Sequence, residues 1–313
     1  MSSIQTVTGR IDATQLKAAY VHEHLYTLAT PEVVAENASM ELSDLHKIRQ
    51  DLELFKQAGG NLIVEVTTVD YGRDLTKLRV LSEMSGVYIV GTAGFNKGTY
   101  NRSFLENRTA EDVAKELIAE IQTGIDGVKP GILKIGTSKD SIQPWELTGL
   151  HAISIAHLAT GIPITTHTQN GTMANEQLDL FVSFGVKPSS VILGHMDQNP
   201  DFEQHEKLID RGAFLGYDSI PKTKYDTKER AIDFIIRFAR LNKHTHILLS
   251  GDFARQSYFK GFGGKPGLDC LLVEFKPELR NRLIEANLDA DRILEDLFTH
   301  NPRRALALRE VTP

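Results

Sequence analysis

Two histidines one residue apart, His22 and His24, are the first residues of the chain whose type and spacing suggest chemistry. They follow the apolar run 18–21, and side chains at i and i+2 leave a β-strand on the same side. Two neutral imidazoles that converge on one point are typical ligands of a divalent transition metal. Two hydrogen-bonded histidines at a strand end would have the same sequence, so a metal site needs further ligands.

Such candidates occur later in the chain, at Lys134, His167, His195 and Asp252. Any one of them could be structural, but titratable groups at the ends of several apolar runs are typical of an active site. Four imidazoles and a carboxylate exceed the three protein ligands of one catalytic zinc, so the set favours two ions. Two ions about 3.5–4 Å apart need an anionic bridge. Lys134 could provide it as a carbamate, if its amine is neutral and reacts with carbon dioxide.

Eight apolar runs predict the strands that must position these residues, at 18–25, 61–68, 87–95, 131–137, 163–168, 190–196, 213–220 and 245–253. Helical patterns alternate with them at 42–58, 75–84, 110–123, 145–160, 174–184, 202–210 and 231–241. Alternating strands and helices with continuously apolar strands indicate a parallel sheet buried on both faces. The number of units predicts an α/β fold, a single (β/α)8 TIM barrel, with the six side chains at its carboxyl mouth.

The remaining regions set the domain organisation. No glycine-rich phosphate loop follows a strand, which disfavours a doubly wound open sheet. No linker or change of composition divides the chain, so residues 1–313 are expected to form one domain. The stretches 268–283 and 289–309 are expected to be helices that cover the barrel. The loops 27–42 and 254–267 are the long ones.

Composition limits the partners. The formal net charge of −6 argues against nucleic acid bound through bulk electrostatics. The single cysteine, Cys270, excludes an internal disulfide and is interpreted as a packed residue. No run of eighteen apolar residues predicts a membrane span, and the polar stretch 1–8 does not resemble a signal peptide. A cytoplasmic location is therefore expected.

Five motifs, taken in order, resemble the phosphotriesterase family of the amidohydrolase superfamily: His-Glu-His-Leu at 22–25, Leu-Lys-Ile-Gly-Thr-Ser at 133–138, Thr-Thr-His-Thr at 165–168, Leu-Gly-His-Met-Asp at 193–197 and Leu-Ser-Gly-Asp at 249–252. The resemblance covers nearly the whole chain. It implies a (β/α)8 barrel with two divalent ions, zinc first, with manganese or cobalt as alternatives. It further implies that one ion is more buried, the other more exposed, and that a modified lysine joins them. The residues in these three roles would be His22, His24 and Asp252, then His167 and His195, and finally carbamylated Lys134.

The expected reaction is ester hydrolysis, that of a lactonase. A hydroxide shared by two cations is a nucleophile near neutral pH, because the cations lower the pKa of water. Asp252 is the group expected to take the proton of that hydroxide and pass one to the leaving oxygen. No G-x-S-x-G motif occurs, which agrees with a reaction that needs no covalent intermediate.

Two loops bear on the substrate, 219–225 and 252–258. Their charged residues would by themselves be interpreted as solvated loop charges. They also resemble the phosphate site of the family branch that opens phosphorylated sugar lactones, which implies that Lys224, Arg255 and Tyr258 bind phosphate, with Lys222 as the alternative lysine. The expected substrate is a small molecule of the aldono-1,4-lactone 5-phosphate type, and relatives are often homodimers. The alternative is a lactonase or phosphotriesterase that acts on unphosphorylated lactones or organophosphate esters.

Two other classes of protein remain open. Lys134 could form a Schiff base in an aldolase-like enzyme, although the four strand-end histidines argue against it. A non-catalytic metal-binding barrel is disfavoured, because no ligand is missing. Among the other residues, Glu65 and Asp218 are candidate partners of a metal-bound histidine, and Arg73 is interpreted as structural.

Overall fold

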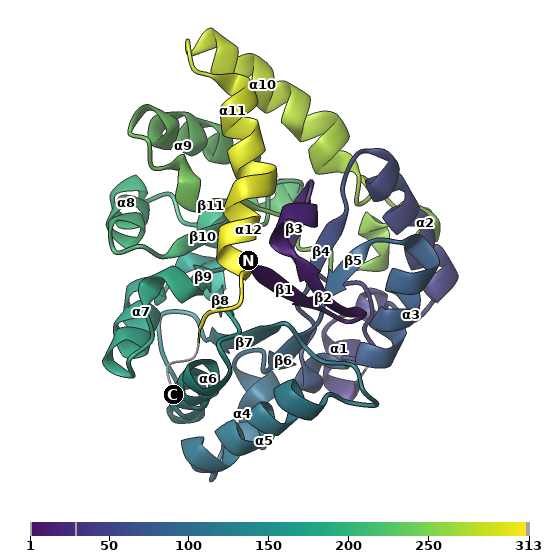
Figure 1. Cartoon of the computed structure of the whole chain (residues 1–313), viewed down its shortest axis with the longest axis vertical. Coiled ribbons are helices and arrows are strands. Elements are labelled where there is room, and N and C mark those ends of the chain that lie inside the picture. The colour runs from purple at the N-terminus through teal and green to yellow at the C-terminus, as the bar shows by residue number, and fades with distance from the viewer. Residues whose placement is uncertain (1, 29, 311–313) are drawn as a thin grey trace.

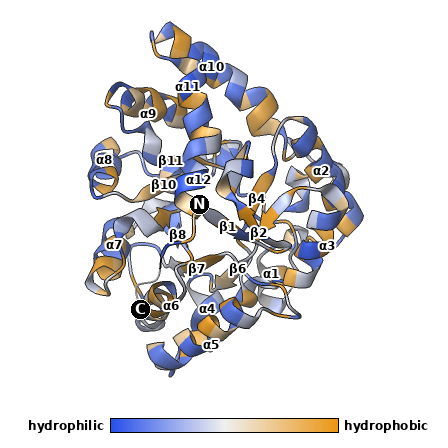
Figure 2. Ribbon diagram, in the orientation of Figure 1, coloured by the Kyte–Doolittle hydropathy of each residue, from blue (hydrophilic) through white to orange (hydrophobic). Residues whose placement is uncertain are grey.

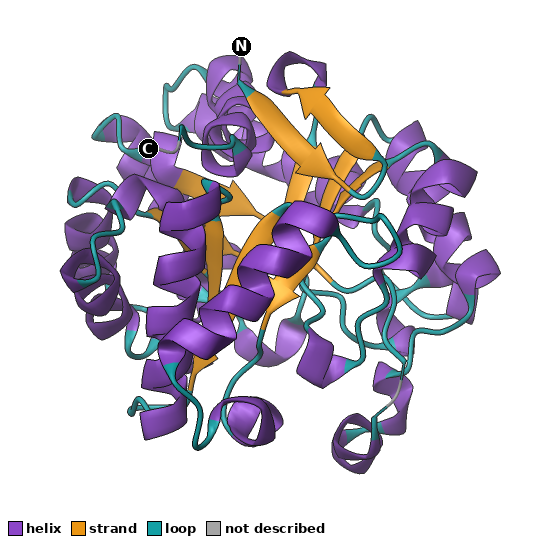
Figure 3. Ribbon diagram, turned by 60° about the horizontal axis from the view of Figure 1, so that its bottom comes forward, coloured by secondary structure: helices purple, strands orange, loops and turns teal. Residues whose placement is uncertain are grey.

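The computed structural model describes residues 2–28 and 30–310 as a ring of parallel strands surrounded by helices (Figures 1 and 3). Each barrel strand lies within one of the eight predicted runs, in the predicted order, and this confirms the α/β barrel. The strands are β3 (Ala19–Glu23), β4 (Leu62–Glu65), β5 (Tyr88–Val90) with β6 (Thr92–Gly94), β7 (Ile132–Thr137), β8 (Ile164–Thr168), β9 (Val191–Leu193), β10 (Phe214–Tyr217) and β11 (Ile247–Leu249).

The barrel ring has two irregular seams. At the first, the third strand is interrupted at Gly91, so that β5 pairs with β4 and β6 pairs with β7. At the second, between β11 and β3, the N–H of Asp252 donates to the carbonyl of His22 (3.1 Å). The N–H of His22 in turn donates to the hydroxyl of Ser250 (2.9 Å). These bonds bring the turn after β11 against the histidine motif of β3.

The ends of the helices that follow the strands lie within three residues of the predicted ends. They are α2 (Leu45–Gln57), α3 (Leu75–Ser85), α5 (Ala110–Thr123), α6 (Pro144–Thr160), α7 (Ala174–Ser183), α8 (Phe202–Asp210) and α9 (Lys228–Arg240). Two short helices that were not predicted, α1 (Pro31–Glu36) and α4 (Thr99–Leu105), lie in the loops after β3 and β6. The carboxy-terminal helices are α10 (Lys276–Glu285), α11 (Ala290–Glu295) and α12 (Asn301–Leu306), with π-helical turns at Leu271–Phe275 and Asp296–His300.

The interior of the barrel is apolar at its amino end. Val21, Val64, Ile132 and Leu248 belong to an inner core, and Figure 2 shows hydrophobic residues on the central strands. An antiparallel hairpin, β1 (Ser3–Thr6) and β2 (Gly9–Asp12), packs with α12 over this end. The carboxyl end carries the polar residues described below. None of the helices in the described part of the chain is long and apolar enough to cross a lipid bilayer.

Candidate metal centre and active site

The six predicted ligands lie together at the carboxyl ends of the strands. They line one cavity of about 200 Å³. His22 comes from β3, His24 follows it directly, and Lys134 and His167 lie in β7 and β8. His195 lies in the turn after β9, and Asp252 lies in the turn after β11. The parallel strands therefore bring side chains from distant parts of the sequence to one mouth.

His22, His24 and Asp252 form the first cluster. Asp252 Oδ1 lies 3.4 Å from His24 Nε2 and 4.0 Å from His22 Nε2. His22 is only 2% exposed; its Nδ1 lies 3.4 Å from Asp218 Oδ2, and its Nε2 has no hydrogen-bond partner among the described residues. A buried polar atom without a partner is unfavourable, so Nε2 points to a ligand. Two imidazoles and a carboxylate whose donor atoms all lie within 4.8 Å of one another fit a divalent metal ion.

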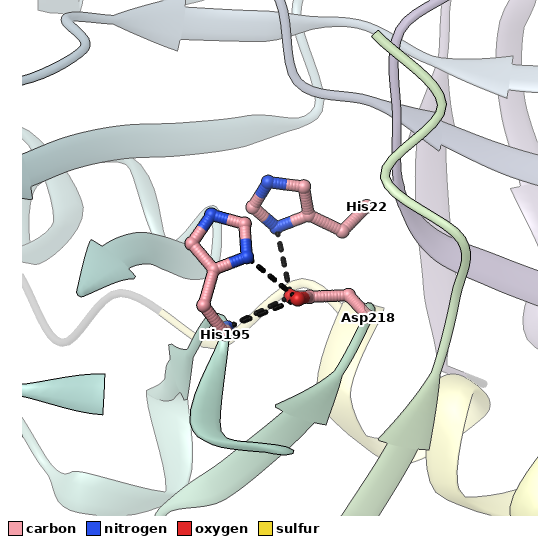
Figure 4. A group of neighbouring side chains, drawn as sticks. All are labelled: His22, His195 and Asp218. Atoms are coloured by element: carbon pink, nitrogen blue, oxygen red, sulfur yellow. Dashed lines mark hydrogen bonds and ion pairs between the residues drawn. The ribbon is translucent and has the colours of Figure 1, made fainter. Parts of the chain in front are cut away.

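His167 and His195 form the second cluster, with one ring nitrogen of each only 2.7 Å apart. His195 Nδ1 lies 2.6 Å from Asp218 Oδ1, and Figure 4 shows that the imidazoles of His195 and His22 both point toward this carboxylate. Burial acts to lower the pKa of His195, but the negative charge of Asp218 outweighs it and the pKa is raised. Asp218 therefore occupies the supporting position that the sequence indicated, beside the histidine of the neighbouring strand.

The environment of Lys134 fits a reactive amine. Its side chain is 2% exposed, and Nζ donates to the carbonyl of Val66 (3.0 Å). Burial lowers the pKa of the amine to about 8. A lysine with this pKa has an appreciable neutral fraction near pH 8, and the neutral form is the one that can react with carbon dioxide.

Glu23, between the two histidines of the motif, turns away from the cavity and into the seam between β3 and β11. Its carboxylate accepts hydrogen bonds from the Ser250 hydroxyl (2.8 Å), the Gly251 N–H (2.6 Å) and the Phe253 N–H (2.8 Å). Burial raises the pKa of Glu23 to about 7. The turn that it holds contains Asp252, whose backbone has a left-handed φ of 47°. Glu23 thus fixes the segment that presents Asp252, a contact that the sequence did not reveal.

Two lysines of the loop 219–225, which follows β10, differ in position. Lys222 is buried, and its ammonium pairs with Asp252 Oδ2. Burial acts to raise the pKa of Asp252, but the charge of Lys222 outweighs it and holds that pKa well below its usual range. Lys224 is exposed, with Nζ 4.4 Å from the centre of the Tyr225 ring. Both lysines line the cavity, Lys222 beside Asp252 of the first cluster and Lys224 on the exposed side.

Arg255 and Tyr258 line the same cavity. Arg255 is partly buried, and its guanidinium makes no hydrogen bond or ion pair within the described part of the chain. The ring of Tyr258 stacks on Phe253, with centroids 5.4 Å apart. The cavity thus contains an arginine that pairs with no carboxylate of residues 2–28 and 30–310, which is an arrangement suited to an anionic ligand.

Other residues around the cavity were not predicted as site residues. They are Met40, Tyr71, Tyr100, Gln169, Asn170, Gln198, Tyr225 and Ala254. Most lie in turns after strands, where no regular period of the sequence indicates the direction of a side chain. Arg73 was interpreted as structural, and its guanidinium contacts Glu120 (2.6 Å) and the carbonyl of Thr92.

Comparison with known proteins gives the family. The model of the phosphotriesterase family matches residues 2–306. A phospho-furanose lactonase from Mycoplasmopsis agalactiae is 28% identical, with 98% of this chain and 92% of that protein covered. The crystal structure of a lactonase from Listeria monocytogenes superposes with a TM-score of 0.94 at 31% identity, covering 99% of this chain and all of that one. The phosphotriesterase homology protein of Escherichia coli, solved with phosphate in its active site, has a TM-score of 0.88 at 29% identity, covering 95% and 100%. The chain belongs to the phosphotriesterase family and is a metal-dependent enzyme that hydrolyses esters.

Proposed function

We propose that this enzyme opens a phosphorylated sugar lactone of the aldono-1,4-lactone 5-phosphate type. The observation that carries the proposal is the unneutralised Arg255, which shares a cavity of about 200 Å³ with the two histidine clusters. A cavity of this size suits a sugar-sized ligand. The relatives named phospho-furanose lactonase and the Escherichia coli protein with bound phosphate add support.

The metal ligands follow from the two clusters. His22, His24 and Asp252 would hold one divalent ion, and His167 and His195 the other. Lys134, as a carbamate, would join the two sites. Zinc is the first candidate, with manganese and cobalt as alternatives. When bound, such ions supply an activated water and polarise the oxygen of the ester under attack.

Asp252 has the environment of a proton acceptor at the start of the reaction. Its low pKa keeps the carboxylate ionised at neutral pH, and Oδ1 faces His24 while Oδ2 faces Lys222. The carboxylate would take the proton of the attacking water and pass one to the ring oxygen that leaves. Lys222 would stabilise the negative charge that develops nearby, because its ammonium is already buried at this carboxylate.

The phosphate would bind away from the clusters, at the rim of the cavity. Lys224, Arg255 and Tyr258 offer an ammonium, a planar guanidinium and a hydroxyl, and together they match a dianion. Lys222 is engaged with Asp252, so Lys224 keeps its place as the expected phosphate ligand. A neutral lactone or an organophosphate triester would leave the charge of Arg255 without a partner, which ranks those substrates second.

Replacing Arg255 by Ala tests the proposal. Loss of one partner of a desolvated charge pair costs about 2–4 kcal/mol, or roughly a 30- to 1000-fold drop in kcat/KM for the phosphorylated lactone. Slow hydrolysis of the matching unphosphorylated lactone should stay within about threefold. Both rates are followed with a pH indicator. Arg280→Ala, at an exposed ion pair with Asp291, is the matched control and should change neither rate. An equal fall for both lactones in Arg255→Ala would refute the phosphate site.

A further inference from the structure

His24 is linked to a buried carboxylate through a hydroxyl. Its Nδ1 lies 2.7 Å from Thr67 Oγ1, and its Nε2 points to Asp252. The Thr67 hydroxyl lies 2.5 Å from Glu65 Oε1. Thr67 and Glu65 are both completely buried, so no solvent competes for these bonds. The chain of contacts therefore runs from Glu65 through Thr67 to the ring of His24.

The direction of these hydrogen bonds follows from the groups that surround Glu65. Oε1 accepts from the N–H of Leu25 (3.2 Å), and Oε2 accepts from the N–H of Thr67 (3.2 Å). Both oxygens thus face donors, which is the environment of an ionised carboxylate. Burial raises the pKa of Glu65 to about 7. This value is still below 8, so the ionised form dominates at pH 8. An ionised carboxylate can only accept, and the single proton of the Thr67 hydroxyl must go to it.

These hydrogen bonds determine the tautomer of the His24 ring. Since the Thr67 hydroxyl has donated its proton, its oxygen can only accept from His24 Nδ1, which must carry a hydrogen. In a neutral imidazole the other nitrogen then has the free lone pair. That nitrogen, Nε2, is the one turned to Asp252. The other tautomer would direct an N–H of His24 toward Asp252 and the proposed metal site. It would also leave two buried acceptors, His24 Nδ1 and Thr67 Oγ1, facing each other without a proton between them.

We propose that Glu65 and Thr67 act as a positioning pair that fixes the Nδ1–H tautomer of His24 and so presents Nε2 to the metal centre. The pair touches neither substrate nor metal and works through His24 alone. His195 is oriented differently, by a carboxylate in direct contact, Asp218. The inference rests on the metal centre of the proposed function, because it needs His24 to be a ligand.

The first test reads the tautomer itself, without metal. At pH 8 the ring nitrogens of ¹⁵N-histidine-labelled, metal-free protein are observed by NMR, and His24→Asn assigns the His24 signals. We expect the Nδ1–H tautomer in the wild type. In Thr67→Val, which replaces the hydroxyl by a methyl of similar shape, the fixed tautomer should be lost. A wild-type His24 with its proton on Nε2 would overturn the proposal.

The second test measures metal retention. Zinc transfer to a fluorescent chelator is compared for the wild type, Thr67→Val and Thr67→Ser, with the thermal unfolding of each metal-free protein as a check on folding. Loss of a group that orients a ligand typically costs 10- to 100-fold in metal affinity, and we expect this range for Thr67→Val. Thr67→Ser keeps the hydroxyl and should stay within about threefold of the wild type. Wild-type retention in Thr67→Val, or an equal loss in Thr67→Ser, would overturn the positioning pair while the metal centre stands. A wild type that binds no zinc would overturn both.

Discussion

Single side chains of this enzyme owe their chemistry to burial and to one or two partners. The positions of the six proposed ligands could be read from the sequence, because each lies within an apolar run with strand-like spacing or near its end. Glu23 and Thr67 could not be recognised in this way. Their partners Ser250 and His24 lie 227 and 43 residues away, and only the folded barrel brings them into contact.

The two lysines of the loop 219–225 show the same limit of prediction from sequence. Lys222 and Lys224 are two residues apart in the sequence, yet one is buried against Asp252 and the other is exposed. Lys222 directly precedes the 3-10 turn Thr223–Tyr225 and Lys224 is its central residue, so the alternation of a strand does not apply there. The sequence could therefore name both lysines but could not say which would lie against Asp252.

His205, on α8, provides a pH-dependent prediction at the residue scale. The side chain is completely buried, its Nδ1 lies 2.8 Å from Tyr217 Oη, and burial lowers its pKa to about 4. The unfolded chain, with a histidine pKa near 6.5, then binds more protons than the folded chain between about pH 4 and 6.5. The contribution of neutral His205 is therefore complete above pH 6.5 and falls by about 3 kcal/mol as the pH drops to 4.

Urea unfolding of metal-free protein at a series of pH values measures this effect. His205→Gln removes the titrating group but keeps an acceptor for Tyr217. We expect the free energy of unfolding of the variant to fall less steeply than that of the wild type between pH 6.5 and 4. Parallel curves over this range would mean that His205 does not set the slope.

At the scale of elements, the order of strands and helices followed from the alternation of apolar runs with capped helical patterns. The short hairpin of β1 and β2 was missed, because four-residue strands in a polar segment lack a readable period. The break of the third strand at Gly91 was also not apparent, since 87–95 is one continuous apolar run in the sequence. Both features depend on contacts with other parts of the barrel.

Glu23 gives the prediction that belongs to the seam between β3 and β11. Its carboxylate accepts from three donors, whereas the amide of Gln has one acceptor oxygen and an NH₂ group that would face N–H groups. We expect Glu23→Gln to lower the free energy of unfolding of the metal-free protein by about 2–4 kcal/mol at pH 8, as for other buried charged groups that lose their partners. Urea unfolding measures the loss.

The control for this variant is Glu53→Gln, on the exposed face of α2, where Glu53 pairs with Arg49. An exposed pair of this kind contributes less than about 1 kcal/mol. If Glu23→Gln were no more destabilising than Glu53→Gln, the seam would be held by its backbone bonds and not by the carboxylate.

At the scale of the whole molecule, the two ends of the barrel differ in composition and role. The amino end is sealed by the inner apolar core, β1, β2 and α12, whereas the carboxyl end gathers histidines, acids and the basic side chains of two loops. The chain has a net charge of −6, so the basic rim is a local feature of the mouth. Stability and chemistry are thereby assigned to opposite ends, as expected for this fold.

The number of metal ions per chain is the measurement that tests the binuclear centre most directly. Protein refilled with zinc in the presence of bicarbonate should contain two ions per chain by elemental analysis. Lys134→Ala should hold fewer and lose activity, part of which an added short-chain carboxylate could restore, while Lys139→Ala, at an exposed lysine nearby, should hold two. A wild-type chain that never binds more than one zinc ion, or a Lys134→Ala variant that binds two and is fully active, would contradict the proposed centre.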